Sequence, residues 1–138
     1  MYQTILVTLD TTPTDRAIIE HIKKLALRLG SRVVLLHVAT GVPAQWNKSD
    51  AEGEEVRQDR AYLREVQAEF TAAGITATAE LAFGDPVSEI VKWVSQNQCD
   101  LVAMSTHGHG LVADLILGTT ASHVQHSISV PVLLLRAK

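Results

Sequence analysis

The sequence is poor in cysteine, and it contains no apolar run long enough to cross a bilayer as a helix. Its single cysteine, Cys99, excludes an internal disulfide bond and fits a reducing compartment. The first ten residues lack the basic and apolar regions that are typical of a signal peptide. Together these absences predict a cytoplasmic protein without membrane insertion.

An excess of basic residues is also missing. The chain carries 12 Lys and Arg against 15 Asp and Glu, which gives a formal net charge of −3. It has no run of basic residues, so nucleic acid is not an expected partner. The remaining composition is ordinary for a globular protein, since 46% of the residues are hydrophobic and 20% are charged. The 138 residues suffice for one hydrophobic core, and we predict a single domain over residues 1–138.

Several common functional motifs do not occur. The Walker A motif, G-x4-G-K-(S/T), is absent. The spacing Gly108-x-Gly110-x2-Ala113 imitates the dinucleotide-binding fingerprint, but it follows the fourth apolar stretch rather than the first and lacks the expected acidic residue downstream. Two histidine pairs, His107-x-His109 and His123-x2-His126, could suggest zinc. They lack cysteine partners or an ordered set of carboxylates, so zinc is not predicted and metal ligands stay unassigned. No nucleophile with a matching base stands out, so no catalytic residue is predicted.

Apolar stretches that are typical of strands alternate with stretches of helical periodicity along the whole chain. Strands are expected at residues 4–10, 32–39, 75–83, 101–104 and 130–136. Helices are expected from Thr12-Pro13 to Gly30, over residues 51–73, after Gly84-Asp85-Pro86, and after Gly118. This alternation predicts an α/β fold with a parallel sheet. The stretch 75–83 alternates apolar and polar residues, which predicts an edge strand.

Residues 101–120 combine an apolar strand, a glycine-rich loop and the start of a helix. Nine residues separate Gly108 from Gly118, and Thr119 and Thr120 follow. Glycine lets backbone N–H groups approach an anion closely, and free N–H groups at a helix N-terminus favour negative charge. The stretch therefore predicts a phosphate-binding loop. The alternative is that the glycines only form a turn.

This loop resembles the nucleotide-binding motif of universal stress proteins of the UspA type, G-x2-G-x9-G-(S/T). The chain reads Ser105-x2-Gly108-x9-Gly118-Thr119, so only the first glycine differs. The resemblance implies a doubly wound, five-stranded parallel sheet with strand order 3-2-1-4-5 and helices on both faces. Ligands bind such sheets at the carboxyl ends of the strands where the order reverses, which are Asp10 and Met104-Ser105 here.

The resemblance also implies a set of ligand-binding residues. Asp10, at the end of Thr8-Leu9-Asp10, would accept from ribose hydroxyls or help hold a metal; capping the following helix is the alternative. Val38 would meet the adenine through its backbone, and Met104 would lie under the adenine, although core packing explains a methionine equally well. His37 is expected to be a core or sheet residue rather than a ligand. The implied phosphate donors are Gly108, His109, Gly110, Gly118, Thr119 and Thr120, preceded by Ser105.

The function that the resemblance implies is a stress-response module that binds ATP, ADP or AMP, with Mg²⁺ or Mn²⁺, and acts through an unidentified protein partner. A nucleotide-free interaction protein with a degenerate loop is the alternative. A slow ATPase is weaker, because residues 105–120 contain no Lys or Arg to stabilise a transferring phosphate. The last strand is apolar at nearly every position and would lie at a sheet edge, so a homodimer through this strand is expected.

Overall fold

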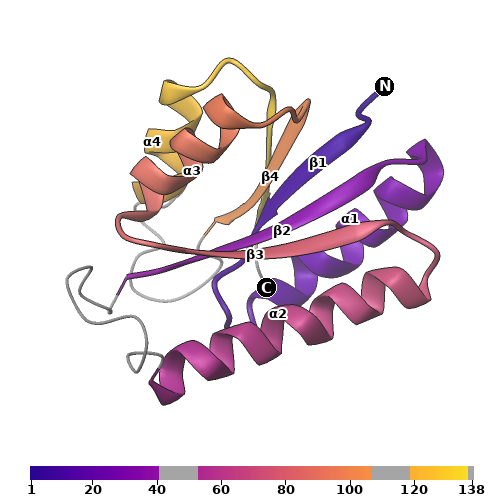
Figure 1. Cartoon of the computed structure of the whole chain (residues 1–138). Coiled ribbons are helices and arrows are strands. Elements are labelled where there is room, and N and C mark those ends of the chain that lie inside the picture. The colour runs from indigo at the N-terminus through magenta and orange to yellow at the C-terminus, as the bar shows by residue number, and fades with distance from the viewer. Residues whose placement is uncertain (41–52, 107–118, 137–138) are drawn as a thin grey trace.

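The computed structural model describes residues 1–40, 53–106 and 119–136. Strands and helices alternate along these residues, as predicted (Figure 1). In chain order they are β1 (Thr4–Thr8), α1 (Asp15–Leu29), β2 (Arg32–Ala39), α2 (Glu54–Ala72), β3 (Ala77–Phe83), α3 (Pro86–Gln96), β4 (Leu101–Thr106), α4 (Thr119–Ser127) and β5 (Val132–Arg136).

The strands form one parallel sheet in the order β3-β2-β1-β4-β5, which confirms the predicted order 3-2-1-4-5. Helices α1 and α2 cover one face and α3 and α4 the other (Figure 1). β3 lies at an edge, as its alternating pattern predicts. None of the helices that the structure describes is long and apolar enough to cross a bilayer.

Two hydrophobic layers hold the helices to the sheet. Successive side chains of a strand point to opposite faces, so strands that are covered on both faces are apolar throughout. On the α1–α2 side the layer includes Ile5, Val7, Val33, Leu35, Ala103, Ile18, Ile22, Leu63 and Phe70. On the α3–α4 side it includes Leu6, Val34, Leu36, Val102, Met104, Ile90, Ala121 and Val124.

Local signals mark the end of α1 and the start of α3. Gly30 closes α1 with φ 70°, a left-handed conformation that glycine adopts readily. Asp85 caps α3 by accepting from the Ser88 N–H, with Pro86 in the first turn, as predicted. The expected start of α1 at Thr12-Pro13 was wrong, because regular helix begins only at Asp15. β5 likewise begins at Val132 rather than residue 130.

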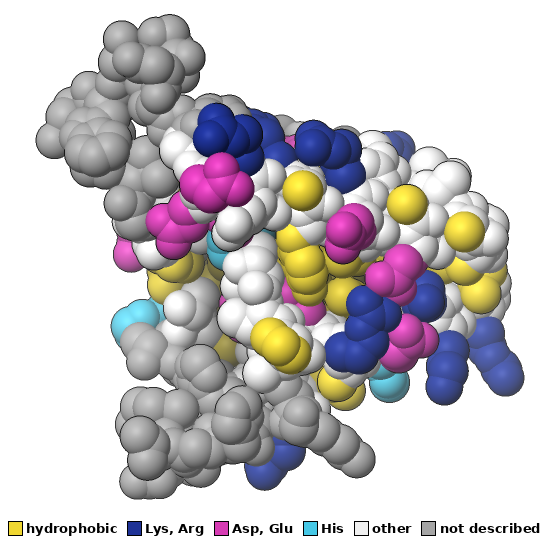
Figure 2. Space-filling model, turned by 90° about the horizontal axis from the view of Figure 1, so that it is seen from below, with side chains coloured by type: hydrophobic (Ala, Val, Ile, Leu, Met, Phe, Trp, Pro, Cys, Tyr) yellow, Lys and Arg dark blue, Asp and Glu magenta, His cyan; other side chains and the backbone are white. Residues whose placement is uncertain are grey.

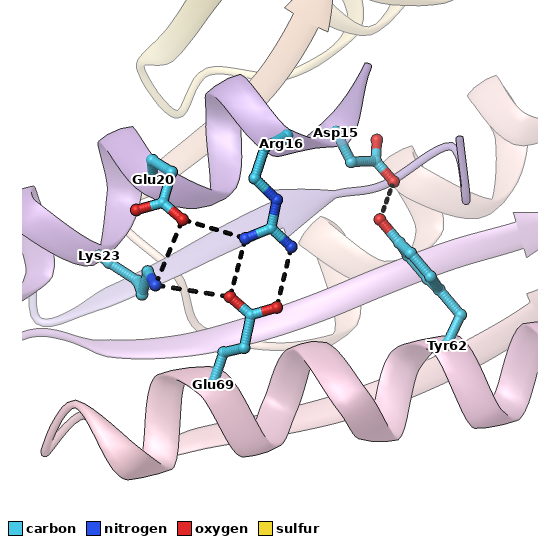
Figure 3. A network of polar contacts seen from close by, with 6 residues as sticks. All are labelled: Asp15, Arg16, Glu20, Lys23, Tyr62 and Glu69. Carbon is cyan, nitrogen blue, oxygen red and sulfur yellow. Dashed lines mark hydrogen bonds and ion pairs between the residues drawn. The ribbon is translucent and has the colours of Figure 1, made fainter. Parts of the chain in front are cut away.

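The face covered by α1 and α2 carries charges of both signs. Figure 2 shows Lys and Arg side chains interspersed with Asp and Glu over these two helices. Arg16 on α1 pairs with Glu69 on α2 at 2.8 Å and with Glu20 at 3.0 Å, and Lys23 approaches Glu20 and Glu69 at 3.4 Å (Figure 3). This network joins the two helices along their exposed surface.

Candidate functional site

A cavity of about 180 Å³ lies at the carboxyl ends of β1, β2 and β4. The strand order reverses between β1 and β4, and doubly wound sheets bind ligands at this point. Seven residues predicted from the sequence line the cavity: Thr8, Leu9, Asp10, Val38, Met104, Ser105 and Thr120. The predicted strand ends therefore do converge on one site.

The remaining predicted residues belong to the phosphate loop. Gly108, His109, Gly110 and Gly118 lie outside the described residues. Thr119 opens α4, directly before the cavity residue Thr120. The role of this segment as a source of phosphate donors thus stays a prediction.

Four further residues line the cavity, although the sequence analysis did not assign them to a ligand site. They are Leu36, His37, Ile90 and Ala121. Three of them belong to helical or strand patterns that predict only burial, so periodicity alone does not separate them from the rest of the core. His37 was assigned to the sheet, and it does lie in β2.

His37 of β2 lies beside the cavity and contacts both the segment that follows β1 and helix α2. Its Nδ1 lies 2.8 Å from the Leu9 carbonyl oxygen and donates to it, because a carbonyl can only accept. Its Nε2 lies 3.5 Å from Asp59 Oδ2 of α2, which makes an ion pair whenever the ring carries a second proton. Both ring nitrogens are therefore directed at protein atoms, in agreement with the predicted structural role.

Ser105 takes an ordinary strand conformation in β4. A residue other than glycine is strained where its φ is positive, and among the described residues only Tyr2 and Thr11 are in that position. Serine in place of the first motif glycine therefore causes no backbone strain at position 105. The Ser105 Oγ is buried and has no hydrogen-bond partner within the part of the chain that the structure describes. A buried hydroxyl without a partner is costly, and a ligand atom in the adjoining cavity would satisfy it.

Asp10 is exposed, and Leu9 and Asp10 are the two residues that directly follow β1. The alternative reading of Asp10 as a helix cap was wrong, because the N-cap of α1 is Thr14. The turn that carries Asp10 is held instead by Asp15, whose carboxylate accepts from the backbone N–H groups of Asp10 and Thr11. Asp15 was not recognised from the sequence.

Two larger hollows, of about 450 and 470 Å³, lie at the opposite ends of the strands. One acidic side chain there is already engaged, because the Asp100 carboxylate accepts from the N–H groups of Gln3 and Thr4 at 2.8 and 3.0 Å. Both hollows are at the amino ends, whereas ligands of such sheets bind at the carboxyl ends. The smaller cavity beside Ser105 is therefore the better candidate.

The described residues do not form a metal site of their own. Within residues 1–40, 53–106 and 119–136, no group of three or more His, Cys, Asp or Glu side chains is arranged to hold an ion. Asp10 brings one carboxylate to the cavity. A divalent cation would therefore need ligand atoms beyond the described protein groups, such as phosphate oxygens.

The model of the universal stress protein family matches residues 1–136 of this sequence. The chain belongs to the universal stress protein family. The resemblance seen in the glycine loop is thereby confirmed over nearly the whole chain.

Two named relatives give the degree of similarity. Universal stress protein MJ0577 of Methanocaldococcus jannaschii is 25% identical, over 100% of this chain and 97% of that protein. Universal stress protein Slr1230 of Synechocystis is 36% identical over 64 residues, which are 46% of this chain and 22% of that protein. The match thus spans about a fifth of Slr1230 and nearly all of MJ0577.

Solved structures share the fold. The structure of MJ0577 superposes with a TM-score of 0.86 at 23% identity, covering 100% of this chain and 98% of that one. A universal stress protein in complex with cAMP gives 0.80 at 20% identity, with 99% of both chains covered. The Archaeoglobus fulgidus protein in complex with dAMP gives 0.71 at 15% identity, covering 96% and 97%.

Proposed function

We propose that this universal stress protein binds an adenine nucleotide at the cavity between β1 and β4, and acts in the stress response through a partner protein. The observation that carries the proposal is the buried Ser105 Oγ, which lines the cavity and has no partner among the described residues. Polar atoms inside proteins are nearly always hydrogen-bonded, so this hydroxyl favours a polar ligand.

The cavity suits the base and ribose of a nucleotide. Val38 and Met104 are 8% and 3% exposed and give it an apolar wall for a purine, while Asp10 offers a carboxylate to ribose hydroxyls. Its volume of about 180 Å³ is below the roughly 300–1,000 Å³ of typical ligand pockets. The described residues would therefore form only one part of a larger site.

The phosphates would extend toward the start of α4. Gly108, His109, Gly110, Gly118, Thr119 and Thr120 are the proposed donors. The N-terminus of a helix attracts anions through its free N–H groups and its dipole. Two proteins of the same fold, in complex with cAMP and with dAMP, support the choice of an adenine nucleotide.

The negative charge around the proposed site favours binding of ATP together with a cation. Asp10 lies at the cavity, Asp114 is in the loop sequence, and residues 105–120 contain no Lys or Arg. A triphosphate would meet this negative environment without a positive side chain from the loop. We therefore propose that Mg²⁺ or Mn²⁺ accompanies ATP, and that AMP depends on metal less.

Calorimetry with ATP and AMP, each with and without Mg²⁺, tests the proposal. Both nucleotides are expected to bind, and Mg²⁺ is expected to strengthen ATP binding more than AMP binding. Gly118→Val is expected to abolish binding, because it places a branched side chain in the proposed phosphate loop. A wild-type protein that binds neither nucleotide at millimolar concentration would favour the nucleotide-free alternative.

A slow ATPase remains the second candidate from the family resemblance. The lack of Lys and Arg in residues 105–120 argues for little turnover, since phosphoryl transfer needs its charge neutralised. Phosphate release at several turnovers per second, lost in Gly118→Val, would favour catalysis over simple binding.

A further inference from the structure

The turn that follows β1 has an unusual backbone. Thr11 adopts φ 61°, in the left-handed region that side chains rarely occupy. A β-branched residue is especially unfavourable there, because its Cβ substituents crowd the backbone. Asp10 lines the candidate cavity directly before Thr11, so the same turn determines where Asp10 stands.

A buried carboxylate holds this turn. Asp15 is 1% exposed and stands at the first position of α1. Its Oδ1 accepts from the Asp10 N–H at 2.9 Å, and its Oδ2 accepts from the Thr11 N–H at 2.8 Å. The N-terminal end of the helix also favours a negative charge at this place. The carboxylate therefore fixes two successive N–H groups of the turn.

A tyrosine from α2 completes the arrangement. The Tyr62 hydroxyl donates to Asp15 Oδ2 at 2.7 Å, and Figure 3 shows the ring reaching from α2 toward the start of α1. Burial of the ring and the nearby Asp15 carboxylate raise the pKa of Tyr62 well above its usual value of 10. The hydroxyl thus stays protonated and donating at neutral pH. Asp15 and Tyr62 lie 47 residues apart in the sequence.

We propose that Asp15 and Tyr62 are positioning residues for ligand binding, which hold the Asp10–Thr11 turn in the conformation that brings Asp10 to the cavity. The inference rests on the proposed nucleotide function, and it assigns affinity to two residues that do not line the cavity. A purely structural role would make them matter for stability alone.

Glycine at position 11 separates these two roles. Glycine takes positive φ at little cost, so a Thr11→Gly chain needs the carboxylate less to form the turn. If Asp15 acts by positioning, Thr11→Gly should recover much of the affinity that Asp15→Asn loses. If Asp15 only stabilises the fold or adds charge, glycine should recover none.

The experiment measures the dissociation constant of AMP by calorimetry for the wild type and four variants. Asp15→Asn is expected to weaken AMP binding about tenfold, and Tyr62→Phe, which keeps the ring, about threefold. Asp15→Asn combined with Thr11→Gly is expected to bind within about threefold of the wild type. Glu69→Gln is the matched control, since it breaks the Arg16 pair between the same two helices and should leave the affinity unchanged.

Amide spectra supply a second readout. The N–H resonances of Asp10 and Thr11 should shift in Asp15→Asn and Tyr62→Phe but not in Glu69→Gln. If Asp15→Asn fails to fold, Tyr62→Phe decides the question alone.

The experiment distinguishes a failure of the proposed function from a failure of the positioning role alone. A wild type that binds no AMP refutes the proposed function, and the inference falls with it. A wild type that binds, with Asp15→Asn and Tyr62→Phe binding equally well, overturns the inference alone. Weakened binding that Thr11→Gly does not restore also overturns it.

Discussion

Ser105 carries opposite consequences for stability and for binding. Its hydroxyl is buried and has no partner in the described part of the chain, which disfavours the ligand-free protein. Its backbone is that of a regular strand residue, so its cost lies in the hydroxyl rather than in strain. A ligand that hydrogen-bonds to this hydroxyl would remove the free-energy cost that the ligand-free protein carries.

Ser105→Ala should therefore stabilise the ligand-free protein and weaken AMP binding. Removing an unsatisfied hydroxyl is expected to raise the free energy of unfolding by about 1 kcal/mol, and the lost ligand contact to weaken binding about two- to tenfold. Urea denaturation and calorimetry measure the two effects.

Ser31→Ala is the matched control for this substitution. Ser31 is 5% exposed, and its hydroxyl donates to the Tyr2 carbonyl oxygen, far from the cavity. It should destabilise the protein and leave AMP affinity unchanged. A Ser105→Ala protein that behaves like Ser31→Ala would contradict the role of Ser105 as a ligand contact.

At the level of elements, α1 and α2 are joined by charges whose strength depends on pH. The hydrogen bond from Arg16 lowers the pKa of Glu69 from its usual 4.5 to about 2, against the opposing effect of burial. A lowered pKa means that the carboxylate stabilises the fold above pH 4.5 and ceases to do so as the pH falls toward 2. The Glu69 side chain is 34% exposed, so solvent limits its contribution to about 1 kcal/mol or less.

Glu69→Gln should accordingly lower stability only where the carboxylate is charged. The free energy of unfolding of the variant is expected to lie below that of the wild type at pH 6, and the difference should vanish as the pH approaches 2. Urea denaturation at a series of pH values measures this difference. A gap that persists unchanged at pH 2 would mean that the substitution acts through packing.

Elements were predictable where their signal is local. The strands β1, β2 and β4 each carry a run of apolar residues, as expected where helices cover both faces, and α3 begins with a proline behind its aspartate cap. The start of α1 was missed because Asp15 bonds back to the turn rather than forward into the helix. No pattern in the sequence shows that bond.

The candidate site likewise contains residues whose place at the cavity was predictable from the sequence and others whose contribution was not. Asp10 and Met104 were predictable, because the carboxyl ends of parallel strands must meet at the switch point. The contribution of Tyr62 was not, because it depends on a hydrogen bond between helices 47 residues apart. Ser105 was visible as a departure from the motif, but its missing partner is evident only once the surrounding strands are in place.

At the scale of the whole molecule, the sheet has two unlike edges. β3 forms one edge and carries Glu80 near its middle, a charge that discourages pairing with another strand. β5 forms the other edge, hydrogen-bonded to β4 on one side. Its residues Val132, Leu133, Leu134 and Leu135 are half-buried in the single chain, and its one charge, Arg136, stands at the end.

An apolar edge strand is rarely left open, so β5 is the expected surface for a homodimer. Leu134→Lys should convert the dimer into monomer or aggregate, because it places a charge in the middle of the proposed interface. Light scattering measures the mass, and circular dichroism checks that the fold persists. Leu27→Lys is the control, since Leu27 is a 53% exposed apolar residue of α1 and not of the β5 edge, and its replacement should leave the dimer intact. A Leu134→Lys protein that remains a dimer would place the interface elsewhere, and a monomeric wild type would show that the β5 edge stays open in solution.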